Sequence, residues 1–204
     1  MTIRFHKGDL PNLDAYKDSI AVDSETLGLN PLRDRLCVVQ LSPGDGTADV
    51  VQIAKGQTEA PNLKSLLEDE NRTIIFHFAR FDVAVLKHAL GIRCSNVYCT
   101  KIASRLTRTY TDRHGLKDLV REFIGIDISK QQQSSDWAAE TLTQAQLEYA
   151  ASDVLHLHDL RAHLDVRLAR EERSAFAKAC FEFLPTRSDL DLAGWPEEDI
   201  FAHS

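Results

Sequence analysis

The chain has 204 residues, of which 43% are hydrophobic and 27% are charged, a composition typical of one folded domain with a sizeable core. This composition excludes a chain that is disordered throughout. The 24 Lys and Arg residues against 31 Asp and Glu give a net charge of −7. Diffuse attraction to phosphates is therefore excluded as a means of holding a long nucleic acid, and any such contact has to be local.

The sequence contains no run of about 18 apolar residues, so it predicts no membrane span and no membrane partner. The first residues, MTIRFHKGDLPN, lack the apolar run of a secretion signal. Four cysteines are present without a C-x-x-C pair, which argues against a zinc ribbon or a redox dithiol: Cys37, Cys94, Cys99 and Cys180. We therefore expect free thiols and a cytoplasmic protein.

The first half of the chain predicts strands and then alternating strands and helices. β-rich runs at residues 19–23, 36–41 and 48–53 are separated by Gly, Pro, Asn and Asp clusters, which predicts an antiparallel meander. A helix is expected after Pro61 and Asn62, followed by a strand at 73–78 and a helix at 80–90.

The second half is helical in pattern, with helices predicted at 101–106 and 116–123 and over a long stretch from about 143 to 173. Strands first and helices afterwards make an α/β domain with a mixed sheet. Pro, Gly, Asp and Glu accumulate in residues 185–204, which predicts an extended acidic tail at the end of a single domain spanning 1–204.

Residues 100–121 form a basic segment within this acidic chain. Six basic residues face two acidic ones there, a net charge of +4. The segment is a candidate phosphate-facing surface, and the alternative is a solvated helical face paired with acids elsewhere.

Two carboxylates, Asp23 and Glu25, stand two residues apart at the end of an apolar strand. The period of two in a strand sends both side chains to one face. Like charges repel there, unless a cation such as Mg²⁺ or Mn²⁺ lies between them. Taken alone, the pair would be better explained by one acid that caps a turn.

Two further acids follow later in the chain. Asp82 lies in the first turn of the helix at 80–90, where the helix dipole alone would favour an acid. Tyr149 and Asp153 are four residues apart in the long helical stretch, so they lie on one face of it.

Taken in order, D-x-E on a strand, an Asp after a later strand and Y-x-x-x-D on a late helix form a joint pattern much rarer than its parts. It resembles the DEDD superfamily of 3′-5′ exonucleases, in the subgroup with tyrosine. The resemblance spans about residues 19–170, the expected catalytic core. It implies a ribonuclease H-like mixed sheet of five strands, flanked by helices, whose first three strands are the meander.

The segment 130–137, KQQQSSDW, followed by Leu142 and the Tyr149 motif, resembles ribonuclease D and its relatives. Those proteins usually carry Arg-Pro before the leucine, where this chain has Glu140 and Thr141. They also continue into helical RNA-binding domains. The shorter form resembles the nano-RNase C branch, which implies a 3′-5′ exoribonuclease that degrades very short RNAs, chiefly dinucleotides, and assembles as a homo-octamer.

The resemblance also implies roles for the five motif residues. Two divalent cations, Mg²⁺ or Mn²⁺, would assist hydrolysis to nucleoside 5′-monophosphates. Asp23, Glu25 and Asp153 would hold one cation, and Asp23 with Asp82 the other. Tyr149 would orient the attacking water, because a phenol with a pKa near ~10 is a poor free base.

Three other residues are candidate substrate contacts. Leu29 stands six residues after Asp23, as does the leucine that separates the two bases in oligoribonucleases. Trp137 would stack on a base or ribose, and packing inside is the equal alternative. His77 would donate to a phosphate, unless it is a structural histidine at a strand end.

Two other functions remain open from the sequence. The first is a general 3′-5′ exonuclease on longer RNA or DNA ends, like ribonuclease D. The second is a non-catalytic nucleic-acid-binding module, against which the presence of all four acids argues.

Overall fold

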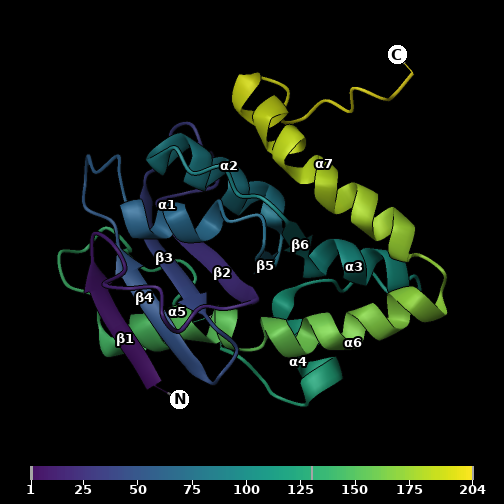
Figure 1. Ribbon diagram of the computed structural model, residues 1–204, viewed down its shortest axis with the longest axis horizontal. Coiled ribbons are helices and arrows are strands. Elements are labelled where there is room, and N and C mark those ends of the chain that lie inside the picture. Colours follow the sequence, from purple (N-terminus) through teal and green to yellow (C-terminus); the bar gives the residue numbers. More distant parts are fainter. Residues whose placement is uncertain (1, 130, 204) are drawn as a thin grey trace.

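The computed structural model describes residues 2–129 and 131–203, so Lys130, the first residue of the predicted 130–137 motif, lies outside the described residues (Figure 1). Its centre is a mixed sheet of six strands, which are β1 (Thr2–Lys7), β2 (Ser19–Thr26), β3 (Leu36–Ser42), β4 (Thr47–Gln52), β5 (Thr73–Phe76) and β6 (Val97–Cys99). The described helices are α1 (Pro61–Leu67), α2 (Ala79–Leu90), α3 (Thr100–Thr107), α4 (Leu116–Ile124), α5 (Gln144–Leu155), α6 (Leu157–Arg170) and α7 (Ser174–Ala193).

The sheet has the order β1-β4-β3-β2-β5-β6. Strands β2, β3 and β4 form the antiparallel meander that the sequence predicts, whereas β1, β5 and β6 pair in parallel with their neighbours. The α/β class and the mixed sheet are therefore confirmed. The number of five strands implied by the resemblance is wrong, because the sheet has six; of these, β1 and the short β6 were not located from the sequence.

Helices cover both faces of the sheet (Figure 1). On one face, α1 and α2 pack over alternate residues such as Ile20, Val22 and Ile74. On the other face, α5 and α6 pack over the residues between them, such as Ala21 and Ile75. This alternation decides which side chains of β2 reach each face.

The predicted helix from 143 to 173 is two helices. The backbone breaks at His156, between α5 and α6. The break lets α5 lie across β2, β3 and β4 while α6 packs against α3 and α4. The strand predicted at 73–78 also ends earlier, at Phe76, because Phe78 adopts a left-handed backbone conformation (φ 76°) at the start of α2.

The expectation of an extended tail at 185–204 is wrong for its first nine residues. Helix α7 continues through Pro185 to Ala193 and ends at Gly194. It packs along α2, and the buried carboxylate of Asp191 accepts hydrogen bonds from Arg80 on α2 and from Arg187 on α7 itself. These tertiary contacts outweigh the turn-forming composition of the segment.

No helix in the described part of the chain is both long and apolar enough to cross a membrane.

Candidate active site

Three carboxylates meet where β2 passes under α5. Asp23 and Glu25 point to the same face of the sheet, as the spacing predicts, and α5 crosses that face carrying Asp153. One carboxylate oxygen from each of these residues lies within 4.8 Å of the other two. The structure thus brings together residues that are 128 positions apart in the sequence.

The electrostatics of this group are unfavourable without a counter-charge. Burial raises the pKa of Asp23 well above its ordinary value, and the neighbouring acids raise it further. Burial and the charge of Asp153 raise the pKa of Glu25 to about 9. Since carboxylate oxygens are the ligands that Mg²⁺ and Mn²⁺ prefer, a divalent cation would turn this repulsion into attraction. The donor set therefore fits a metal centre.

Asp82 approaches from the opposite face of the sheet. Its helix, α2, covers the face to which Ser24 points, and Ser24 Oγ donates a hydrogen bond to Asp82 Oδ1 at 2.6 Å. Burial raises the pKa of Asp82 to about 7, although the bonds from Ser24 oppose the shift. Asp82 is close enough for its charge to raise the pKa of Asp23. It lies outside the group of three oxygens described above.

Tyr149 lies one helical turn before Asp153, and its hydroxyl hydrogen-bonds to that carboxylate. Burial raises the pKa of the phenol, and the charges of Asp153, Glu25 and Asp23 add to the effect. The phenol therefore stays protonated at neutral pH and acts as a hydrogen-bond donor rather than as a base. A capping box formed by Thr143 and Gln146 fixes the start of this helix.

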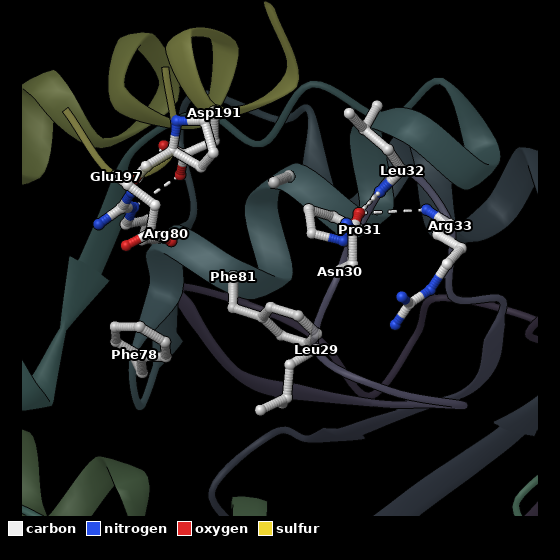
Figure 2. Close-up of a pocket in the computed structure, with 12 residues that line it drawn as sticks. Leu29, Asn30, Pro31, Leu32, Arg33, Phe78, Arg80, Phe81, Asp191 and Glu197 are labelled. Carbon is white, nitrogen blue, oxygen red and sulfur yellow. Dashed lines mark hydrogen bonds and ion pairs between the residues drawn. The ribbon is translucent and has the colours of Figure 1, made fainter. Parts of the chain in front are cut away.

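The three candidate substrate contacts lie in different environments. Leu29 is 87% exposed and lines a pocket of about 530 Å³ together with Phe78, Arg80 and Phe81 (Figure 2). Trp137 is only 1% exposed and packs against Tyr149, with 5.9 Å between the ring centroids. A base cannot stack on a side chain so enclosed, so the structure favours the alternative in which Trp137 packs inside.

His77 follows the end of β5, and its Nδ1 lies 2.9 Å from Thr100 Oγ1. The ring is half-buried, at the point where β5 turns into α2. This contact is the one expected of a structural histidine at a strand end.

The basic segment at 100–121 does not form one surface. Arg108 is buried and forms an ion pair with Glu122, which matches the alternative of a residue paired with an acid. Lys101 and Arg105 instead line a second pocket of about 240 Å³, beside Arg80 and Arg187. The Lys101 ammonium lies 4.3 Å from the centre of the Phe78 ring.

Sequence reasoning missed several residues of this region. No sequence pattern predicts the hydrogen bond from Ser24 to Asp82 or the left-handed backbone of Phe78. Gln40 did carry a signal, because it is one polar residue within the apolar run LCVVQL. Its Nε2 donates to Asp23 Oδ2 at 2.7 Å.

The comparisons with known proteins agree with this geometry. A family model described as a 3′-5′ exonuclease matches residues 9–169. A ribonuclease D of Gluconacetobacter diazotrophicus is 34% identical over 154 residues, which are 76% of this chain and 39% of that protein. The chain thus spans about two fifths of the length of this relative. The chain belongs to the 3′-5′ exonuclease family, in its ribonuclease D-like group.

Within that group, the chain is similar over its whole length to NrnC of Brucella melitensis, of the nano-RNase C branch. The structure of NrnC with bound Mg²⁺ is 67% identical, with a TM-score of 0.97 and full coverage of both chains. The structure of NrnC bound to pGG is 68% identical, with a TM-score of 0.98 and the same coverage. This chain is therefore a 3′-5′ exonuclease of the ribonuclease D and NrnC type.

Proposed function

We propose that this protein is a 3′-5′ exoribonuclease that hydrolyses very short RNA, mainly dinucleotides, to nucleoside 5′-monophosphates. The observation that carries the proposal is the convergence of Asp23, Glu25 and Asp153 within 4.8 Å, with Tyr149 bonded to Asp153. An enzyme of this kind would act as one domain across residues 1–204, since the described helices pack on one sheet or on the helices that cover it.

Two divalent cations, Mg²⁺ or Mn²⁺, supply the activation of water and the neutralisation of charge on the attacking and leaving oxygens. Asp23, Glu25 and Asp153 would hold the first. Asp23 and Asp82 would hold the second, and Asp82 has a second carboxylate oxygen besides the Oδ1 that accepts the bond from Ser24. Tyr149 would orient the attacking water beside Asp153 by hydrogen bonding.

The preference for dinucleotides has two supports. NrnC of Brucella melitensis has been solved with pGG, a dinucleotide, and matches this chain from end to end. The exposed Leu29 and the Phe81 ring line one pocket, which suits apolar contact with bases (Figure 2). We assign Leu29 the separation of the two bases.

The second pocket supports recognition of a 5′ phosphate. Lys101 and Arg105 belong to the basic segment and share this pocket with Arg80. Arginine and lysine are the side chains that bind phosphate best. Although its Nδ1 contacts Thr100, His77 directly precedes Phe78 of this pocket, and we keep it as a further candidate donor to a phosphate.

The alternative is a general exonuclease acting on longer RNA or DNA ends, as the relation to ribonuclease D suggests. The net charge of −7 argues against it, because each added phosphate gains little attraction from this surface.

The deciding experiment measures hydrolysis of 5′-labelled RNA from two to twenty nucleotides, and of matching DNA, with Mg²⁺ or Mn²⁺. We expect kcat/KM to be highest for the dinucleotide and to fall with length. Asp23→Ala should abolish hydrolysis and leave the circular dichroism spectrum unchanged. Equal rates at all lengths would favour the alternative, and full activity of Asp23→Ala would overturn the assignment of the site.

We further propose that the chain assembles as a homo-octamer in the cytoplasm. The assembly is proposed from the relation to the nano-RNase C branch, and light scattering on the purified protein measures it directly. The compartment is proposed from the cysteines, all four of which are free thiols.

A further inference from the structure

Gln40 is a fully buried polar residue at the centre of an apolar strand. It lies on β3 directly opposite Asp23 on β2, in the antiparallel register of the two strands, and its exposed fraction is 0%. Residues opposite one another in such a pair point to the same face. The side chain of Gln40 therefore shares the face on which Asp23, Glu25 and Asp153 meet.

The amide of Gln40 contacts both acids of the D-x-E pair. Its Nε2 donates to Asp23 Oδ2 at 2.7 Å. A side-chain hydrogen bond from Gln40 to Glu25 also stabilises the charged form of that carboxylate. An amide NH₂ group has two hydrogens, so one group serves two carboxylates.

The chemistry of the pair fixes the orientation of the amide. Carboxylates accept hydrogen bonds, so the NH₂ side of Gln40 faces them and the oxygen faces away. Gln40 Oε1 is buried and has no hydrogen-bond partner among the described residues. Leaving a buried acceptor unpaired destabilises the fold, because the group loses its bonds to water and gains none in the protein. A structural role in the sheet alone gives no reason for that cost, since an apolar side chain would avoid it.

A neutral donor also suits a metal centre better than a cation. Arginine or lysine at this position would neutralise the carboxylates and repel a divalent ion. The amide instead holds the oxygens in place and leaves their negative charge available. Groups that hold metal ligands in this way affect metal affinity by about 10–100-fold.

We infer that Gln40 is a positioning residue for the metal centre, which fixes the carboxylates of Asp23 and Glu25 at the spacing that binds a divalent cation. The inference rests on the proposed metal-dependent function of the same site. Strand β3, which carries none of the acidic motif residues, would thus also contribute to the metal centre.

The test measures Mn²⁺ binding calorimetrically without substrate, for the wild type and for Gln40→Met, which keeps the side-chain length and removes both hydrogen bonds. We expect the dissociation constant to rise about tenfold. The Mn²⁺ concentration that gives half-maximal dinucleotide hydrolysis should rise by a similar factor, with little change in KM for the dinucleotide at saturating metal.

Gln52→Met is the matched control. Gln52 lies on the adjacent strand β4, and its amide donates to the backbone oxygen of Ala139 rather than to an acid. Its loss should leave Mn²⁺ affinity within twofold of the wild type. If Gln40→Met does not fold, Gln40→Asn replaces it, because its donor is one methylene too short to reach both carboxylates, and the same tenfold loss is expected.

The results distinguish a failure of the positioning role of Gln40 from a failure of the proposed function. Wild-type Mn²⁺ affinity in the folded Gln40 variant would overturn the positioning role and leave the proposed function intact. If the wild-type protein itself binds no divalent cation, the proposed function fails.

Discussion

At the scale of single residues, the pair of Tyr149 and Asp153 can be compared with the pair of Tyr98 and Asp165. Tyr149 bonds to Asp153 beside the acidic group, whereas the Tyr98 hydroxyl donates to Asp165 at 2.8 Å between β6 and α6. Burial raises the pKa of both phenols, so both are donors at neutral pH. Tyr149 lies beside the acidic group and Tyr98 beside Asp165, so Tyr98 serves as the control for Tyr149.

Tyr149→Phe should lower kcat about 10²-fold, the scale of one lost orienting group in proton-transfer chemistry, with Mn²⁺ affinity retained. Tyr98→Phe should leave kcat unchanged and lower the melting temperature slightly. Steady-state kinetics and calorimetry measure both variants. An unchanged kcat for Tyr149→Phe would remove the phenol from the proposed reaction.

Glu25 provides a second test through stability. A carboxyl whose pKa rises from about 4.3 in the unfolded chain to about 9 in the fold destabilises the fold increasingly as the pH rises above the unfolded value. Glu25→Gln should therefore raise the melting temperature at pH 7 in EDTA and prevent the stabilisation that Mg²⁺ gives the wild type. A lower melting temperature in EDTA would contradict the repulsion described for this site.

The sequence was sufficient to predict the face shared by Asp23 and Glu25 and the helical turn between Tyr149 and Asp153, because both follow from local periodicity. It was not sufficient to predict that Trp137 is buried or that Asp82 approaches from the opposite face of the sheet. Burial of Trp137 depends on α5 packing over β3 and β4. The bond from Ser24 to Asp82 depends on which helix covers which face.

At the scale of elements, strand β1 pairs in parallel with β4, and one buried acid of β4 binds two of its side chains. Asp49 on β4 accepts hydrogen bonds from Arg4 and Tyr16, and its Oδ1 lies 2.7 Å from His6 Nε2. Burial opposes the ionisation of Asp49, but these bonds outweigh it and hold its pKa below the ordinary value. Long-range contacts of this kind explain why β1 and the three-residue β6 were not located from the sequence, and the Asp191 contacts explain the same for the end of α7.

Asp49→Asn should lower the free energy of unfolding by about 2 kcal/mol at pH 7, the scale of a hydrogen bond to a charged group. Because the folded pKa is depressed, this stabilisation is present above the unfolded pKa of about 3.9 and is lost as the pH falls through the folded value. Urea unfolding at pH 7 and near pH 2 measures it. A difference between variant and wild type that stays constant with pH would contradict the proposed role of charge.

At the scale of the whole molecule, the negative net charge and the pocket that contains Lys101 and Arg105 predict how the affinity for RNA depends on salt. The affinity of a catalytically inactive Asp23→Ala variant for RNA should fall with salt at a similar logarithmic slope for two and for twenty nucleotides, since only local phosphates are contacted. Fluorescence anisotropy over 50–200 mM salt gives both slopes. A slope that grows with length would indicate a longer phosphate track and favour the alternative function.

Strand β2 presents Asp23 and Glu25 to one helical layer and Ser24, between them, to the other. Gain or loss of one residue within the strand would exchange the two sides, burying carboxylates among aliphatic groups and turning the serine toward α5. Any viable descendant of this chain can therefore change amino acids around the strand but must keep its length.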